Sequence, residues 1–207
     1  MHAADGRDVG CLWTVRTDGY GRIIGRQYDA QRLGGVAVEL RSHLPIERQA
    51  RGIGATWLDQ QLIGGANGIA LVSNRGFGGE VRDALRERSN FLIEQGMAKW
   101  RGQRVILARN LLGTLRGCEI DATAKTIAAE TGLTHHPVSD DERVTGIYRR
   151  NLQLASGRYA MLDDGMGFSL VPWRPVIEQR LGQQVSATVC GGGVSWEIGR
   201  QRGPSVG

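Results

Sequence analysis

Arginine is the residue type through which this sequence most plainly offers binding chemistry. Of its 26 basic residues only Lys99 and Lys125 are lysine, which leaves 24 arginines, and 21 acidic residues bring the net charge to +5. A guanidinium group presents donors in a planar fork that matches phosphate oxygens and base edges, so an arginine surplus suits contact with nucleic acid. A GC-rich genome that encodes arginine in place of lysine produces the same composition. Composition alone does not separate these two interpretations.

The positive charge is concentrated in two segments of the chain. Residues 75–116 contain nine basic and four acidic side chains, and residues 146–207 contain seven and four. By contrast, residues 117–145 contain two basic and six acidic side chains, and residues 1–74 contain eight and seven. A polyanion is therefore expected to bind at residues 75–116, at residues 146–207, or at both.

The residue types needed for catalysis do not form a recognisable arrangement in the sequence. The segment 19–25 resembles a dinucleotide-binding loop, but its third glycine comes one residue late and no clear amphipathic helix follows, so a hairpin turn is predicted. Asp163 and Asp164 stand at an Asp-Gly turn signal between two predicted strands, which favours a turn over a metal or acid–base pair. His135 and His136 point apart in an extended chain and have no acidic or cysteine partner at ligand spacing. We expect no catalytic residue, no metal site and no cofactor.

Cysteine usage and hydrophobic runs indicate the cellular compartment. Cys11, Cys118 and Cys190 lie far apart and are odd in number, which excludes a disulfide framework and a CxxC-type zinc site. The first residues do not resemble a secretory signal, and no apolar run approaches the roughly 20 residues of a membrane span. We expect a cytoplasmic protein without membrane insertion.

Glycine-rich breaks divide the sequence into three predicted pieces of an α+β protein. Glycine makes up 31 of 207 residues. The first piece, residues 1–54, has β-like runs at 12–15 and 36–40, and because it starts in mid-pattern we expect it to be a remnant of a longer protein. The second piece, residues 55–138, is predicted to be a helical module. The third, residues 144–203, is predicted to be a small β-barrel.

The second piece predicts the order of elements found in a winged-helix-like module. A short helix is expected over residues 56–63 and a longer one over 78–95. A hairpin with a basic tip at 99–103 follows, and then one or two helices over 110–130.

Five arginines of this module are candidates for DNA contact. In the functional interpretation the longer helix presents Arg82, Arg86 and Arg88 to a duplex. Arg101 and Arg104 on the hairpin then reach phosphates. The alternative is a compact helical connector whose charged face is simply solvated.

The third piece predicts a closed barrel of the OB-like or SH3-like kind. Its expected order is three strands, a short helix and two further strands. The strands are predicted at 146–154, 158–162, 168–171, 185–189 and 194–198, with the helix at 175–181.

Aromatic residues alternate with arginines along this predicted barrel. The aromatics are Tyr148, Tyr159, Phe168, Trp173 and Trp196. On an OB-type face such residues stack bases while the arginines track phosphates. The candidate DNA-binding residues of the barrel are Arg149, Arg150, Arg158, Trp173 and Arg174. The alternative is that the aromatic side chains fill the barrel core.

Several strings of the sequence resemble a known family. They include residues 55–59 (ATWLD), 80–85 (EVRDAL), 155–165 (ASGRYAMLDDG), 171–175 (VPWRP) and 199–203 (GRQRG). Together they resemble the C-terminal, functionally uncharacterised domain of a group of proteobacterial conjugative relaxases. These are mobilisation nucleases that nick plasmid or integrative-element DNA at the transfer origin. The similarity covers roughly residues 40–207, with the predicted barrel the most specific part.

The resemblance implies a part in conjugal DNA transfer. It implies that the chain binds DNA near the transfer origin, or docks to relaxosome proteins or to the type IV secretion machinery. The relaxase nuclease domain, with its catalytic tyrosine and metal-binding histidine cluster, lies N-terminal to this region in the family. No His-hydrophobe-His motif occurs here, and Tyr20 and Tyr28 have no metal site beside them. The four histidines are His2, His43, His135 and His136.

We therefore expect a non-catalytic region of a relaxase. The alternative is a protein-interaction or secretion-signal module with no DNA binding of its own.

Overall fold

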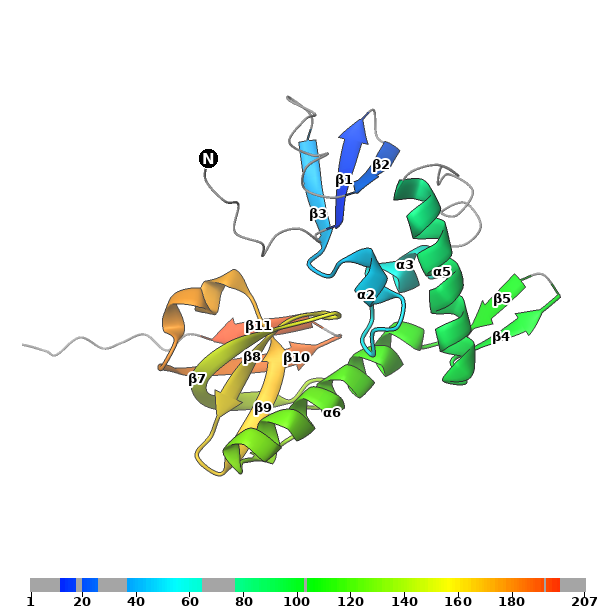
Figure 1. Cartoon of the computed structure of the whole chain (residues 1–207). Helices are drawn as coiled ribbons and strands as arrows, with labels where there is room; N and C mark the ends of the chain where they lie inside the picture. The colour runs from blue at the N-terminus through cyan, green and yellow to red at the C-terminus, as the bar shows by residue number, and fades with distance from the viewer. Residues whose placement is uncertain are drawn as a thin grey trace, which may run out of the picture. The chain divides into compact units, whose positions relative to one another are not determined.

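The computed structural model confirms the α+β class, with helices and three separate antiparallel or mixed sheets (Figure 1). It describes residues 12–17, 20–25, 37–64, 77–102, 104–191 and 193–197, and for residues 12–41 and 77 it describes the backbone only.

The N-terminal piece forms the predicted β segment. Strands β1 (Leu12–Thr17), β2 (Tyr20–Gly25) and β3 (Ala37–Ser42) make an antiparallel sheet in the order β2-β1-β3. Strand β2 covers the segment that resembled a dinucleotide loop, and Tyr20 pairs with Thr17 across the hairpin. The segment therefore belongs to a hairpin, but its residues 20–25 form a strand and not the predicted turn, and residues 18 and 19 lie outside the described residues.

Three helices follow, and they share a small apolar core. They are α2 (Ile46–Gln49), α3 (Trp57–Ile63) and α5 (Phe77–Glu94), of which the last two match the predicted helices to within one residue. Helix α3 begins at a capping box in which the Thr56 backbone N–H donates to Asp59 Oδ2 at 2.7 Å. The buried core residues are Ile46, Ala50, Trp57, Leu58, Val81, Ala84 and Leu85.

The predicted hairpin and last helix are also present. Strands β4 (Ala98–Arg101) and β5 (Arg104–Leu107) pair antiparallel, and α6 (Leu111–Thr131) is one continuous helix. A second apolar cluster fixes the base of the hairpin. It contains the buried residues Leu92, Leu111 and Leu115 and, packed on them, Ala55, Leu62, Phe91, Met97, Ala98 and Leu107.

The third piece forms a six-stranded sheet in the order β11-β10-β7-β8-β9-β6. Its elements are β6 (Thr134–His135), β7 (Arg143–Leu154), β8 (Gly157–Asp163), β9 (Gly167–Pro172), the 3₁₀ helix η1 (Pro175–Arg180), β10 (Gln184–Cys190) and β11 (Gly193–Glu197). The predicted order of three strands, helix and two strands is confirmed, and β6 is an addition that the sequence did not suggest.

The prediction of a closed barrel is wrong, because the sheet is open with β11 and β6 at its edges. The edge of β9 that a closing strand would need is occupied by β6, which runs parallel to it. Immediately after β6, the His136 N–H donates to the Phe168 carbonyl oxygen at 2.8 Å. A Cβ at Gly167 would collide with the Thr134 carbonyl oxygen, so glycine permits this close pairing.

Strands β8 and β9 are buried on both faces, which explains their continuous apolar sequence. Ala160 and Leu162 face one cluster, together with Tyr148 and Ile177. Met161, between them, faces a second cluster that includes Ala124, Ile127, Phe168 and Leu170. The α6 residues of this second cluster pack on the face of the sheet that Met161 occupies.

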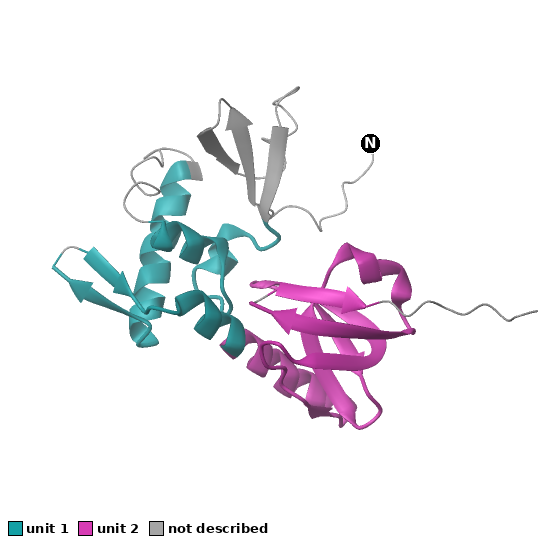
Figure 2. Ribbon diagram, turned by 180° about the vertical axis from the view of Figure 1, so that it is seen from behind, with its two compact units in different colours: residues 1–117 teal, residues 118–207 magenta. Residues whose placement is uncertain are grey.

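The chain divides into two compact units, residues 1–117 and 118–207 (Figure 2). The sequence placed a boundary in the polar loop near residue 139, whereas the division falls within α6. The reason is that Ala124 and Ile127 of this helix belong to the core of the sheet. Among the described helices, none combines the length and apolar character needed to cross a lipid bilayer.

Candidate nucleic-acid interface

The β4–β5 hairpin extends outward from the C-terminal end of α5, within the first unit (Figure 1). Arg101 pairs with Arg104 as the last cross-strand pair before the turn at Gly102. Gly102 in that turn has a φ of 61°, which suits the first central position of the turns that connect tight hairpins. The turn therefore places both arginines at the tip.

One face of the hairpin is cationic. Side chains alternate along a strand, so Lys99 and Arg101 of β4 share a face with Arg104 and Ile106 of β5. All four are exposed. Within the described part of the chain, none of the three cations has a hydrogen bond or ion pair to its side chain. We call these four residues the cationic face.

The arginine pair at the tip has an unfavourable arrangement for folding. Like charges directly opposite each other on an antiparallel ladder repel, and that repulsion lowers hairpin stability. A bound polyanion would remove this repulsion by neutralising both guanidinium groups.

The segment around the hairpin is free of acidic residues. Between Glu94 and Glu119 the sequence contains five cations and no carboxylate. The cations are Lys99, Arg101, Arg104, Arg109 and Arg116. The local potential at the hairpin is therefore positive, with no neighbour in the sequence to neutralise it.

Helix α5 differs sharply from the hairpin, because one of its three candidate arginines is buried. Arg88 has a side chain that is 0% exposed, and its Nε and Nη2 each lie 2.8 Å from an oxygen of Asp59. It also donates to the carbonyl oxygens of Gly52 and Gly54. The interpretation of Arg88 as a DNA contact is wrong: this arginine joins α5 to α3 and to the loop before it.

The exposed surface of α5 is mixed in charge. Arg86 is exposed and Arg82 is half-buried, and the two lie one turn apart on the helix. The exposed carboxylates of the helix are Glu80, Asp83, Glu87 and Glu94. Arg51 is paired with Glu87, and the pKa of Arg51 is raised by that hydrogen bond. With more carboxylates than exposed arginines, α5 is a weaker candidate than the hairpin for binding phosphates.

The candidate arginines of the second unit are mostly paired with carboxylates. Arg149 Nε lies 2.9 Å from Asp163, and Arg150 Nη2 lies 3.3 Å from Glu130. Arg149 stands at an irregularity in the β7–β8 register. Each cation therefore has an anionic neighbour that weakens its attraction for phosphate.

Arg158, Trp173 and Arg174 lie in strings that the relaxase resemblance used. The Arg158 guanidinium lies 3.7 Å from the centroid of the Trp173 ring, and the Trp173 backbone N–H donates to the Arg158 carbonyl oxygen at 2.8 Å. The Trp173 indole N–H donates to the Tyr148 hydroxyl at 3.1 Å. Arg174 is exposed, and its side chain has no partner among the described residues. The two segments ASGRY and VPWRP therefore pack against each other.

A further contact explains the start of the ASGRY string. The Glu119 carboxylate on α6 accepts hydrogen bonds from the backbone N–H groups of Ala155 and Ser156 at 2.7 and 3.0 Å. It also accepts one from the Ser156 hydroxyl. The glutamate anchors the β7–β8 turn to α6, so this string has a structural role.

The aromatic residues of the sheet fill its core. Tyr148, Tyr159 and Phe168 are each less than 5% exposed. Trp173 and Trp196 are partly buried and pack against the same core as Tyr148. The three buried rings cannot stack on bases without unfolding, so the core interpretation holds for them.

The two aspartates considered for catalysis lie in a turn, and His136 lies beside it. Asp163 and Asp164 accept hydrogen bonds from backbone N–H groups of residues 165–167, which confirms the turn prediction. The N–H groups of Met166 and Gly167 lower the pKa of Asp164, whose Oδ2 also lies 3.2 Å from His136 Nδ1. Burial lowers the pKa of His135. Among the described residues, no group of three or more metal-ligating side chains comes together.

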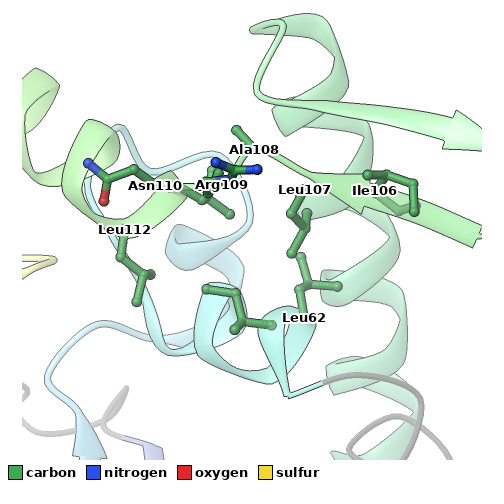
Figure 3. A pocket seen from close by; sticks show the side chains of 10 residues that line it. Leu62, Ile106, Leu107, Ala108, Arg109, Asn110 and Leu112 are labelled. Carbon is green, nitrogen blue, oxygen red and sulfur yellow. The ribbon is translucent and has the colours of Figure 1, made fainter.

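A shallow pocket of about 440 Å³ lies beside β5 (Figure 3). It is lined by Leu62 and Ile63 at the end of α3, by β5 and by the start of α6, with Ile106 and Leu107 among its apolar residues. Among the described residues that line it, Arg109 is the only charged one. An apolar lining with one cation suits the binding of an apolar group that carries an anion.

Residues 3–205 match the sequence family described as "Protein of unknown function (DUF3363)". The chain belongs to this family. No curated protein and no solved structure matches the chain. The match extends over nearly all of this DUF3363 chain, including the N-terminal sheet.

Two features of the DUF3363 chain escaped the sequence interpretation. The first is Trp100, which is 55% exposed on the hairpin. The second is the acid-free run around it, because counting charge over residues 75–116 merged an acidic helix with a basic hairpin. Counting charge element by element would have separated the basic hairpin from the acidic helix.

Proposed function

We propose that this chain is a non-catalytic module of a conjugative relaxase, acting in plasmid or integrative-element transfer by binding DNA through the β4–β5 hairpin. The observation that carries the proposal is the pair Arg101 and Arg104, two unpartnered cations opposite each other at an exposed tip. The resemblance of the strings quoted above supports the placement in conjugation. Cytoplasmic location follows from that placement.

The chemistry of this interface is phosphate contact. Lys99, Arg101 and Arg104 provide donors to phosphate oxygens, which carry no sequence information directly. Binding is therefore largely independent of DNA sequence and depends steeply on salt, because each phosphate neutralised releases condensed counterions. No cofactor or catalytic residue has a part in it.

The experiment is a titration of fluorescein-labelled duplex DNA in low salt, followed by anisotropy. Wild type is compared with Arg104→Glu, which replaces a like-charge pair at the tip with an opposite-charge pair and so leaves the hairpin at least as stable. Lys125→Glu is the matched control, because it makes the same charge change at an exposed position of the second unit. We expect binding by wild type and the control and a large loss for Arg104→Glu. No binding by wild type, or an equal loss in both variants, would overturn the proposal.

A second candidate function is protein docking, as a module of the relaxosome or of the type IV secretion machinery without DNA binding. The pocket beside β5 favours it, because its apolar lining carries one unpartnered cation, Arg109. Ile63, at the rim, is 51% exposed. This candidate predicts that neither wild type nor Arg104→Glu binds DNA, and that Ile63→Asp, at the exposed rim of the pocket, abolishes capture of a transfer protein.

A further inference from the structure

The β4–β5 hairpin has two faces of different chemistry. The cationic face holds Lys99, Arg101, Arg104 and Ile106, as defined above. The opposite face holds Ala98, Trp100, Val105 and Leu107, because pairs Ala98–Leu107 and Trp100–Val105 alternate with the cationic pairs. The hairpin therefore offers charge on one side and apolar surface on the other.

Only part of the apolar side is used for packing within the first unit. Ala98 and Leu107, at the base of the hairpin, join the cluster around Leu92 and Leu111. Trp100, one cross-strand pair nearer the tip, is 55% exposed. Trp100 is not among the residues of that cluster, and Val105 is the residue directly across the ladder.

An exposed indole on one face of a hairpin whose other face is cationic fits a particular kind of ligand. The π face of a nucleic-acid base stacks on an aromatic ring, and the phosphates on either side of that base carry the negative charge that arginine attracts. A blunt duplex keeps its bases stacked inside, so it offers phosphates to the cationic face and nothing to Trp100. An end where two strands separate offers both phosphates and an unpaired base.

We propose that the hairpin recognises a junction between duplex and single-stranded DNA, with the cationic face holding phosphates and Trp100 stacking on an unpaired base. This rests on the proposed function, since it names the form of DNA that the same hairpin binds. The two faces of the hairpin then contact the two separated strands.

The test compares two ligands built on one duplex of 20 base pairs, one blunt and one with two unpaired arms. Affinity is measured by anisotropy, and stacking by quenching of tryptophan fluorescence. The variants are Trp100→Ala and Trp100→Phe. Ile53→Ala is the matched control, because Ile53 is 55% exposed, as Trp100 is, and lies in the first unit outside the hairpin. Near-ultraviolet circular dichroism verifies that each variant is folded.

We expect wild type to prefer the forked DNA. Trp100→Ala should weaken binding to the fork about ten-fold or more and binding to the blunt duplex less than about two-fold, as a single base stacked on an aromatic ring contributes that much. Trp100→Phe should retain most of the affinity, because a phenyl ring still stacks, but should lose the quenching. Ile53→Ala should leave the affinity for both ligands unchanged.

Three results would overturn the proposal. Equal affinity of wild type for fork and blunt duplex would mean that the hairpin reads phosphates alone, and the proposed function would stand without the junction. An equal loss on both ligands in Trp100→Ala would assign Trp100 to holding the hairpin together. Failure of wild type to bind either ligand would remove the proposed function as well.

Discussion

The arginines of the hairpin and those of strand β7 differ in whether a carboxylate lies close to the guanidinium group. Arg101 and Arg104 face each other at an exposed tip, with no carboxylate nearby in sequence. Arg149 and Arg150 each lie within 3.3 Å of a carboxylate oxygen. A paired cation is locally neutralised, whereas an unpaired one adds to the field that attracts a polyanion. The difference teaches that arginine content alone does not locate a DNA site.

The comparison extends to the inside of the first unit, where Arg88 is paired and fully buried. Its partner Asp59 also caps α3 through Thr56, so one carboxylate serves two elements. Losing the cation would leave the carboxylate buried without its charge partner, which is far more costly than losing a solvated pair.

The largest effect is therefore expected for Arg88→Ala. We expect a loss of about 3–5 kcal/mol in the free energy of unfolding, measured by urea denaturation. Arg86→Ala, two positions earlier and exposed, is the control and should change the free energy by less than about 0.5 kcal/mol. Similar small changes in both variants would show that the buried pair is not a stabilising element of this unit.

A smaller effect is expected for Arg158→Ala in the second unit. The variant loses the contact between the guanidinium and the Trp173 ring, which is worth about 1 kcal/mol at a partly exposed site. Since this arginine is engaged with the ring, DNA affinity should be unchanged. Urea denaturation measures the free energy of unfolding, and an anisotropy titration measures the affinity for DNA. A marked loss of affinity with an unchanged free energy of unfolding would place Arg158 in the DNA interface.

The smallest effect concerns pH and His135. Burial lowers the pKa of this imidazole, which lies against Phe168 with ring centroids 5.2 Å apart. As the pH falls below about 6.5, the unfolded chain binds the proton first. The stability contributed by neutral His135 is therefore present above that pH and is lost as the pH falls through the folded pKa.

Melting curves of wild type and His135→Phe between pH 7.5 and 5 test this. The difference in stability between the two proteins should shift in favour of the variant as the pH falls. A difference in melting temperature between the two proteins that stays constant with pH would contradict the expectation. DNA binding should not follow the same pH dependence, because the hairpin segment from 95 to 118 contains no histidine.

Local sequence signals predicted most of the fold. The Asp-Gly turn at Asp164 and the short β-like runs of β7 to β11 each have a short-range cause, so these elements were found. The open sheet was not predicted, because β6 is only two residues long and pairs with a strand more than 30 residues away. No local pattern encodes such a pairing.

The candidate site was predictable only in part, for a related reason. Arg101 and Arg104 were identified because a tight turn and its flanking cations are adjacent in sequence. Arg88 was assigned to the wrong role, because its partner Asp59 lies 29 residues away in another helix. Pairing across that distance is set by tertiary packing and not by the spacing along α5.

The salt dependence of DNA binding tests the central claim most directly. Each phosphate neutralised contributes about 0.9 to the slope of log affinity against log salt concentration. We predict that Arg101→Ala/Arg104→Ala lowers that slope by about two on every duplex, while Arg149→Ala/Arg150→Ala leaves it unchanged. A slope unaltered by the hairpin variant, or lowered equally by the sheet variant, would contradict the distinction between unpaired and paired arginines.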